Sequence, residues 1–399
     1  MDSVFCYRDS DAAAAQSGPL QGLRIAIQPN LSVAGWPTDA GSHALANYTA
    51  LEDATAVQRL RAAGACLCGS TRMSEFGFGL QGSQAGQAIA RQAADAELVL
   101  DLMGESRLAA ANTAVCGFKP SYGLISRYGL IGLIPSMECC GLLSESVPAV
   151  RRILQAVAGP DELDFSLPEE APPHLSPQAI DPPTTTIGVL AEAHNGLPAE
   201  RQEKFRASVH ELQQAGFRIR EVSLPDFPLC SLVHNIVGSV EASSCAGRYD
   251  SVRYGPRPAG AKNWNEMYLL ARGAAFGPLL KSYLFQGAFF QFEYYEAYEN
   301  ACRIRARLLA DVQRLTAQTD FLMLPAVDGA AVGAAASPAD AYAQFAGTLF
   351  ANVTGQPALY LPPAPGAAQA GFQLAGPRRC DGRLLALGEH LLNLRQGGE

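Results

Sequence analysis

Strand and helix patterns alternate along most of this chain, and that alternation limits the fold more than any other feature of the sequence. The first strand is expected at residues 23–27. A helix follows at 53–64, which Asp53 can cap and Gly64 can end. Further strands are expected at 65–69, 98–103, 187–191, 217–223 and 321–325, and further helices at 84–96, 146–158, 200–215 and 286–317. Because strands that alternate with helices form a sheet covered by those helices, we predict an α/β fold.

A proline-rich, acidic stretch at residues 160–183 interrupts the alternation. It has only weak periodicity, which is typical of an exposed connection between structured parts. We therefore divide the chain into a first half, residues 1–159, and a second half, residues 184–399.

The composition indicates a folded, globular protein. Hydrophobic residues make up 48% of the chain and charged residues 17%, which provides ample material for a core. The 30 basic and 38 acidic residues give a net charge of −8, and no segment gathers Lys and Arg into a patch that could neutralise phosphates. Direct binding of nucleic acid is therefore not expected. No apolar run reaches the roughly 18 residues of a membrane span, and residues 1–9 lack a targeting pattern, so a cytoplasmic protein without membrane contact is expected.

Cysteine and histidine show no pattern of a metal or catalytic site. The 10 cysteines are spread thinly over 399 residues without CxxC spacing, so reduced thiols are expected. The 6 histidines are scattered, and none lies near a serine pattern that suggests a base paired with a nucleophile. We therefore expect neither a metal nor a cofactor.

One segment carries a family resemblance. Residues 116–130 read CGFKPSYGLISRYGL, which closely resembles the motif GLKPTYGRVSRYGL of the amidase signature family. The upstream similarity covers residues 33–38, 53–55, 59–65 and 73–76, and a downstream similarity to the A subunit of tRNA-dependent (Asp/Glu) amidotransferases covers 241–244, 248–255 and 294–298. Because these segments are long and collinear, the chain is identified as a member of this family. The resemblance implies one amidase-signature domain over residues 1–399, whose mixed β-sheet is sandwiched by helices (α/β/α) and completed by the second half.

The family cleaves amides with a lysine, a bridging serine and a nucleophilic serine, and the resemblance places each at a substituted position. Gln28 stands where the family motif VKDN has its lysine, and Gln81 stands at the bridging serine of GGSSGGS. The family motif GSDTGGSIRQP aligns without a gap on residues 99–109 and puts Glu105 at the nucleophile. The first lysine of the chain, Lys119, already belongs to the KP motif, so a shifted alignment does not recover the base.

Other positions of the resemblance are changed as well. Met103 replaces a family glycine beside the nucleophile, and Tyr283 and Phe345 replace groups that hold the amino-acid substrate in the amidotransferase protein. Ser106 and Ser83 remain as weak candidate nucleophiles, although no base is visible near either.

Three interpretations of the substituted positions stay open. Their polar groups can satisfy one another and fill the old pocket. They can instead form a new pocket for a small polar or amine-containing ligand. In the third interpretation, amide hydrolysis proceeds through another serine. Arg107 can anchor the sheet edge or bind a carboxylate. The candidate ligand-binding residues are Gln28, Gln81, Glu105, Arg107, Met103 and Gly104.

We favour a degenerate homologue of amidases and of the amidotransferase A subunit that has lost Ser/Ser/Lys cleavage. Such a pseudoamidase would serve as a non-catalytic binding or regulatory subunit. One alternative is an enzyme of altered chemistry in the same cleft, in which Glu105 acts as acid or base with a pKa raised by burial. Another is a structural partner of an active amidase. A protein partner or a second copy of the chain fits each of these hypotheses.

Overall fold

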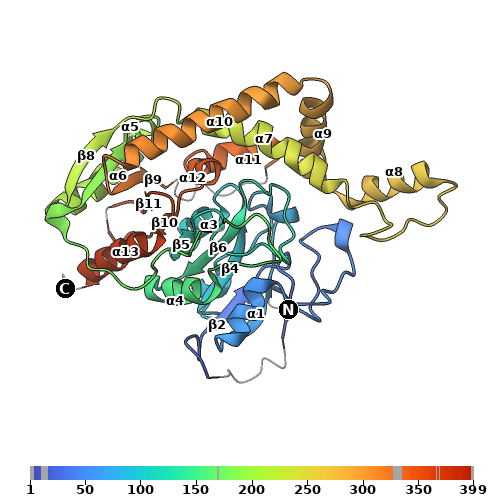
Figure 1. The fold of residues 1–399 in the computed structure, drawn as a ribbon, viewed down its shortest axis with the longest axis horizontal. Helices are drawn as coiled ribbons and strands as arrows, with labels where there is room; N and C mark the ends of the chain where they lie inside the picture. The colour runs from blue at the N-terminus through green and yellow to red at the C-terminus, as the bar shows by residue number, and fades with distance from the viewer. Residues whose placement is uncertain are drawn as a thin grey trace.

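A mixed β-sheet runs through the molecule (Figure 1). The computed structural model describes residues 4–9, 17–168, 170–326, 335–364, 366–367 and 369–396. Within them the sheet has 11 strands in the order β1-β3-β2-β4-β6-β5-β10-β11-β9-β7-β8. The strands are β1 (Phe5–Arg8), β2 (Arg24–Ile27), β3 (Cys66–Thr71), β4 (Ala96–Asp101), β5 (Cys116–Lys119), β6 (Cys139–Ser144), β7 (Thr186–Leu190), β8 (Arg218–Val222), β9 (Phe321–Pro325), β10 (Ala358–Leu361) and β11 (Phe372–Ala375).

Strands from both halves of the chain share this sheet. β2 pairs in parallel with β3 and β4, and β7 pairs in parallel with β8 and β9. The other pairs are antiparallel. The halves meet where β5 pairs with β10, with Gly117 opposite Tyr360 and Lys119 opposite Ala358. The predicted α/β fold with a mixed sheet is therefore confirmed.

Helices cover both faces of the sheet (Figure 1). They are α1 (Thr55–Ala62), α2 (Gln87–Ala90), α3 (Glu105–Thr113), α4 (Val147–Val157), α5 (Ala191–His194), α6 (Ala199–Gln214), α7 (Leu229–Ala246), α8 (Trp264–Ala275), α9 (Pro278–Phe292), α10 (Tyr295–Thr316), α11 (Pro338–Phe345), α12 (Leu349–Thr354) and α13 (Asp381–Gln396). In the described part of the chain, no helix combines the length and the hydropathy needed to cross a membrane.

The central strands divide their side chains between two cores. In β9, Leu322 and Leu324 enter one core, whereas Phe321 and Met323 enter the other. This division follows from strand geometry, because successive side chains point to opposite faces of the sheet. Helices α3, α7, α10 and α12 close the first core, and α1, α4, α6 and α13 close the second.

The start of the first long helix differs from the prediction. Asp53 does not cap it, because α1 begins after Ala54 and has no side-chain cap. The carboxylate of Asp53 instead accepts the N–H of Ala34 at 2.7 Å and pairs with Arg61 at 3.1 Å. The predicted end is confirmed, since Gly64 follows the helix with a φ of 85°.

Two predicted helices are wrong in extent. The helix expected at 84–96 is only the short α2, because Gln92 has a left-handed φ of 57° and Ala96 already begins β4. The helix expected at 286–317 is divided into α9 and α10, since Tyr294 takes the non-helical angles φ −140° and ψ 56°. Short interruptions of this kind do not disturb the helical periodicity of a sequence, so the periodicity does not reveal them.

Candidate functional site

A buried carboxylate lies where β4 passes into α3. The Oε2 atom of Glu105 accepts the N–H groups of Leu102 and Met103 at 2.7 Å and of Gly104 at 3.2 Å. Its Oε1 atom accepts the N–H of Gly79 at 3.3 Å. Only 2% of Glu105 is exposed. The side chain therefore fills a ring of N–H donors, the type of backbone environment that binds anions.

Glycine at position 104 allows this loop to form. Its φ is 121°, and a Cβ atom added there would lie 2.3 Å from the side chain of Thr348. Both the backbone angle and the contact exclude a side chain. The donor ring around Glu105 therefore depends on Gly104.

The environment of Glu105 changes its proton affinity. Burial raises the pKa of Glu105 to about 8, and the neighbouring charge of Asp101 acts in the same direction. Hydrogen bonds from the backbone N–H groups oppose this rise, but their effect is smaller. The carboxyl group of Glu105 therefore exchanges its proton close to neutral pH.

Ser106 is held inside the protein beside Glu105. Its hydroxyl donates to Oδ2 of Asp101, and the same oxygen accepts the Ser106 N–H at 3.1 Å. Strands β5 and β6 approach it closely, since a Cβ atom added at Gly117 or Gly141 would lie 2.4 or 2.6 Å from Ser106. The serine has no exposed surface. Its hydroxyl is therefore fixed within the core.

Arg107 joins α3 to elements of the second half. Its guanidinium donates to the carbonyl of Thr348 at 2.8 Å, to Oδ1 of Asn352 at 2.7 Å and to Oε1 of Gln373 at 3.1 Å. A further, longer contact of 3.5 Å reaches Oδ1 of Asp101. The side chain is fully buried. Its charged group therefore contacts other protein groups and anchors α3 to the second half of the chain.

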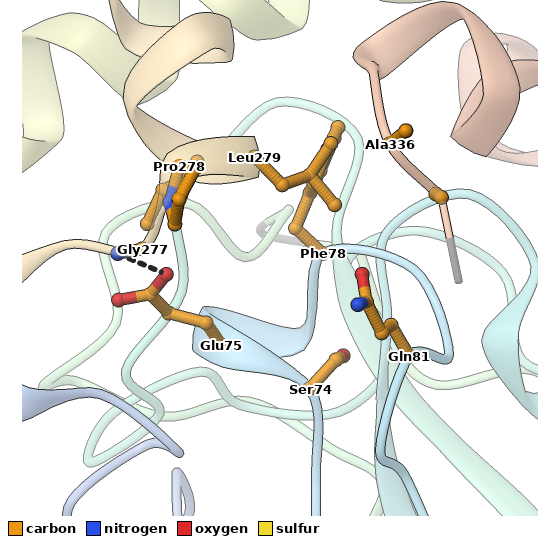
Figure 2. A pocket seen from close by; sticks show the side chains of 10 residues that line it. Ser74, Glu75, Phe78, Gln81, Gly277, Pro278, Leu279 and Ala336 are labelled. Atoms are coloured by element: carbon orange, nitrogen blue, oxygen red, sulfur yellow. Dashed lines mark hydrogen bonds between the residues drawn. The ribbon is translucent and has the colours of Figure 1, made fainter.

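The two glutamines that the family resemblance places at catalytic positions lie in different surroundings. Gln28 is buried, and its Oε1 atom accepts the N–H of Leu100 at 2.9 Å, which ties β2 to β4. Gln81 is exposed and lines a cavity of about 410 Å³ (Figure 2). Ser83 is half-buried, and its Oγ atom accepts the N–H of Ala85 at 3.2 Å. Neither Gln28 nor Glu105 is among the residues that line the cavity.

Met103, Tyr283 and Phe345 are all fully buried. The carbonyl of Met103 accepts the hydroxyl of Thr348 at 2.7 Å, and its side chain packs in the core closed by α3 and α7. The hydroxyl of Tyr283 lies 2.9 Å from that of Tyr342. These three positions contribute to packing. The structure also brings the candidate residues Met103 and Gly104 together with Glu105, because their N–H groups belong to the donor ring.

A buried histidine that was not among the candidate residues joins this network. Nε2 of His234 lies 2.9 Å from the carbonyl of Leu102, and its Nδ1 lies 2.7 Å from the hydroxyl of Tyr342. Burial lowers the pKa of His234 to about 4, so the ring is neutral at pH 7. Because a carbonyl only accepts, Nε2 carries the proton and Tyr342 donates to Nδ1. No sequence pattern marks this residue, since its partners are distant in the chain.

No three His, Cys, Asp or Glu side chains within the described ranges gather closely enough to hold a metal ion.

The sequence profile of the amidase family matches residues 7–100 and 85–385, which is most of the chain. The chain belongs to the amidase family.

Two amidase-family relatives are similar along almost the entire chain. The A subunit of glutamyl-tRNA(Gln) amidotransferase from Natronomonas pharaonis is 33% identical over 408 residues, covering 94% of this chain and 96% of the relative. The protein of the same name from Thermus thermophilus is 35% identical over 404 residues, covering 94% and 85%. The resemblance to amidases and to this amidotransferase protein is therefore confirmed.

Solved structures show the same fold. A structure described as an amidase superposes with a TM-score of 0.80 at 24% identity, covering 98% of this chain and 92% of that chain. The A subunit of glutamyl-tRNA(Gln) amidotransferase from Thermotoga maritima superposes with a TM-score of 0.78 at 22% identity, covering 96% and 86%. The sheet and its covering helices are therefore those of the amidase family.

Proposed function

We propose that this chain is a non-catalytic member of the amidase family, a pseudoamidase with a binding or regulatory role in a complex. The observation that carries the proposal is the position of Glu105. At the place that the family resemblance gives to the nucleophile, a buried carboxylate accepts four backbone N–H groups. A structural carboxylate thus takes the place of a reactive hydroxyl.

The chemistry of amide cleavage supports this proposal. A serine that attacks an amide needs a base to take its proton and free donors to stabilise the oxyanion. The N–H groups of Leu102, Met103 and Gly104 already donate to Glu105. Gln28 stands where the resemblance places the lysine, and its carboxamide has no basic group that could accept a proton.

The remaining serines lack the surroundings of a nucleophile. Ser106 has an acceptor in Asp101, but it is fully buried, so a substrate carbonyl has no path to its hydroxyl. Ser83 is more accessible, and its oxygen accepts the N–H of Ala85 in a local turn. Neither serine combines access to a substrate with an adjacent base.

Acid or base catalysis by Glu105 has one observation in its favour, the pKa raised to about 8. That value suits a group that exchanges protons near neutral pH. However, Glu105 is 2% exposed and does not line the cavity of about 410 Å³. A catalytic acid or base must come within hydrogen-bond reach of its substrate, so the binding role is better supported.

The relatives support a role within a complex. The proteins from Natronomonas pharaonis and Thermus thermophilus are both A subunits of an amidotransferase. We extend this to the present chain as a proposal, in which it binds a protein partner and contributes a ligand site without cleaving amides.

Hydrolysis assays test the non-catalytic role. We expect the purified chain to release no ammonia or amine from glutamine, asparagine or an aryl amide above the rate in buffer. The variants Ser106→Ala and Ser83→Ala should be indistinguishable from the parent chain. Steady-state turnover that either substitution abolishes would contradict the proposal.

A further inference from the structure

The cavity beside Gln81 is formed by segments that are distant in the chain. One wall comes from residues 74–81, which follow β3, and the other from residues 277–280 at the start of α9 (Figure 2). Ala335 and Ala336 complete the lining. Its volume of about 410 Å³ lies in the range of roughly 300–1,000 Å³ that is usual for small-ligand sites.

Glu75 places a negative charge on one side of this cavity. Its Oε1 atom accepts the hydroxyl of Ser42 at 2.7 Å, and its Oε2 atom accepts the N–H of Gly277 at 2.9 Å. These two bonds fix the carboxylate, although a carboxylate has about four acceptor positions in all. Two of its positions therefore remain for a ligand.

No cation in the described part of the chain forms an ion pair with Glu75. Burial has the largest effect on Glu75 and raises its pKa overall. The two hydrogen bonds lower the pKa, and nearby His43 and Lys281 lower it less. The ammonium group of Lys281 donates to the carbonyl of Gly273 at 2.5 Å. A partly buried carboxylate without a paired cation gains most from a ligand that carries one.

Gln81 supplies a second polar group on the opposite side of the cavity (Figure 2). Its carboxamide forms no hydrogen bond with the described residues, whereas the hydroxyl of Ser74 already donates to the carbonyl of Gly79 at 2.6 Å. A carboxamide both donates and accepts, so it complements an amide or a carbonyl group.

Apolar side chains separate these two polar groups. Phe78 and Leu279 lie between Glu75 and Gln81 in Figure 2, and Pro278 lies beside Glu75. Among the described residues that line the cavity there is no Lys or Arg. The cavity therefore offers an anionic end, an apolar middle and an amide end, which disfavours phosphates and carboxylic acids.

We propose that this cavity binds a small molecule with a protonated primary amine at one end and an amide at the other, joined by a short apolar chain. Glu75 accepts the ammonium group, Gln81 pairs with the amide, and Phe78 and Leu279 contact the apolar chain. The inference deepens the proposed binding role and rests on it, because it names the class of ligand that such a protein takes.

Calorimetric titration of the full chain with 5-aminopentanamide tests this site. Pentanamide, which lacks the amine, and pentylamine, which lacks the amide, are the matched probes. We expect 5-aminopentanamide to bind about tenfold or more tightly than pentanamide, because a hydrogen bond to a charged group contributes at least about this factor. We expect pentylamine to bind several-fold more weakly than 5-aminopentanamide.

Two variants assign the binding to the named residues. Glu75→Gln should reduce the affinity for 5-aminopentanamide about tenfold or more, whereas Glu299→Gln, the same change at an exposed site on α10, should leave it unchanged. Gln81→Leu alters an exposed side chain and should fold normally. This variant should bind 5-aminopentanamide more weakly than the parent chain does, and pentylamine equally well. It tests the site even if Glu75→Gln does not fold.

The outcomes separate this inference from the proposed function. Equal binding of 5-aminopentanamide and pentanamide, or no binding of any probe, would overturn the amine site. Unchanged affinity for 5-aminopentanamide in Gln81→Leu would overturn the pairing of Gln81 with the amide. Binding without release of ammonia supports both proposals. Binding with release of ammonia from 5-aminopentanamide would keep the site and overturn the non-catalytic role.

Discussion

Glu105 and Glu75 are both glutamates with raised pKa values, and both accept backbone N–H groups, yet their surroundings differ in one decisive respect. Glu105 has four N–H donors and almost no exposed surface. Glu75 has one hydroxyl and one N–H donor, and it lines a cavity. The difference shows that a raised pKa alone does not identify a functional carboxylate. Glu75 differs from Glu105 in its unfilled acceptor positions and in the cavity beside it.

The strongest test of this contrast is the loss of stability when each glutamate becomes leucine. Glu105→Leu leaves four buried N–H groups without an acceptor, and each such group costs about 1–3 kcal/mol. Allowing for local relaxation, we expect a loss of about 3–5 kcal/mol in the free energy of unfolding, measured with urea. Glu75→Leu should lose only about 1 kcal/mol, because solvent can reach the cavity. Equal losses in the two variants would remove the distinction.

The two glutamines provide a smaller test of the same contrast. Gln28→Leu removes the buried acceptor of the Leu100 N–H and should destabilise the chain by about 1–2 kcal/mol. Gln81→Leu changes an exposed side chain and should stay within about 0.5 kcal/mol of the parent. Thermal unfolding of both variants under one buffer condition measures this difference. A larger loss in Gln81→Leu would show that the cavity wall is structurally required.

The dependence of stability on pH tests the buried glutamate without removing its side chain. Glu105 has a pKa of about 8 in the folded chain against an ordinary value of 4.5, so the folded state holds the proton more tightly. The stability from this group is complete below pH 4.5 and is lost as the pH rises to about 8. Buried Glu97, with a pKa of about 7, acts in the same direction.

Urea unfolding between pH 6.5 and 8 measures this effect. His234, whose pKa is lowered from 6.5 to about 4, opposes it only below pH 6.5. The unfolding free energy of the parent should therefore fall across this range, and that of Glu105→Gln should fall less. Parallel slopes for the two proteins would mean that Glu105 does not titrate there.

The smallest expected effect is on catalysis. The triple variant Gln28→Lys, Gln81→Ser, Glu105→Ser should gain no useful turnover of glutamine or of a small hydrophobic amide. Catalytic groups must be held to within about half an ångström, and orientation can supply about 7–11 kcal/mol of a barrier. Gln28 follows the end of β2 and is buried, whereas Gln81 lies on an open cavity wall. Robust turnover would show that the remaining cleft is intact.

Much of the fold could be predicted from the sequence because it depends on local patterns. The periodicity at 146–158 and 200–215 corresponds closely to α4 and α6. The helix expected at 84–96 failed because its end depends on the left-handed backbone of Gln92, which the composition of the segment does not reveal. The motif at residues 116–130 identified the family, which the profile match confirms.

The site was less predictable, because its contacts join distant parts of the chain. Alignment singled out Glu105, but the hydrogen bond from Gly79 that helps to hold it appears only in the folded structure. The cavity is harder still to foresee, since Glu75 meets Gly277 across the interior. In the sequence, Glu75 stands only within the family-like segment 73–76, and no local pattern links it to the start of α9.

The pairing of β5 with β10 has a consequence for how the chain is assembled. In the described part of the chain, this ladder is where strands of residues 1–159 meet strands of residues 184–399. Each half made alone would end its sheet at an open strand edge with buried side chains on both faces, which favours aggregation. Two fragments separated within residues 160–183 and produced together would cover each other's edges. The exposed connection is therefore the place where this protein could be divided and reassembled from its pieces.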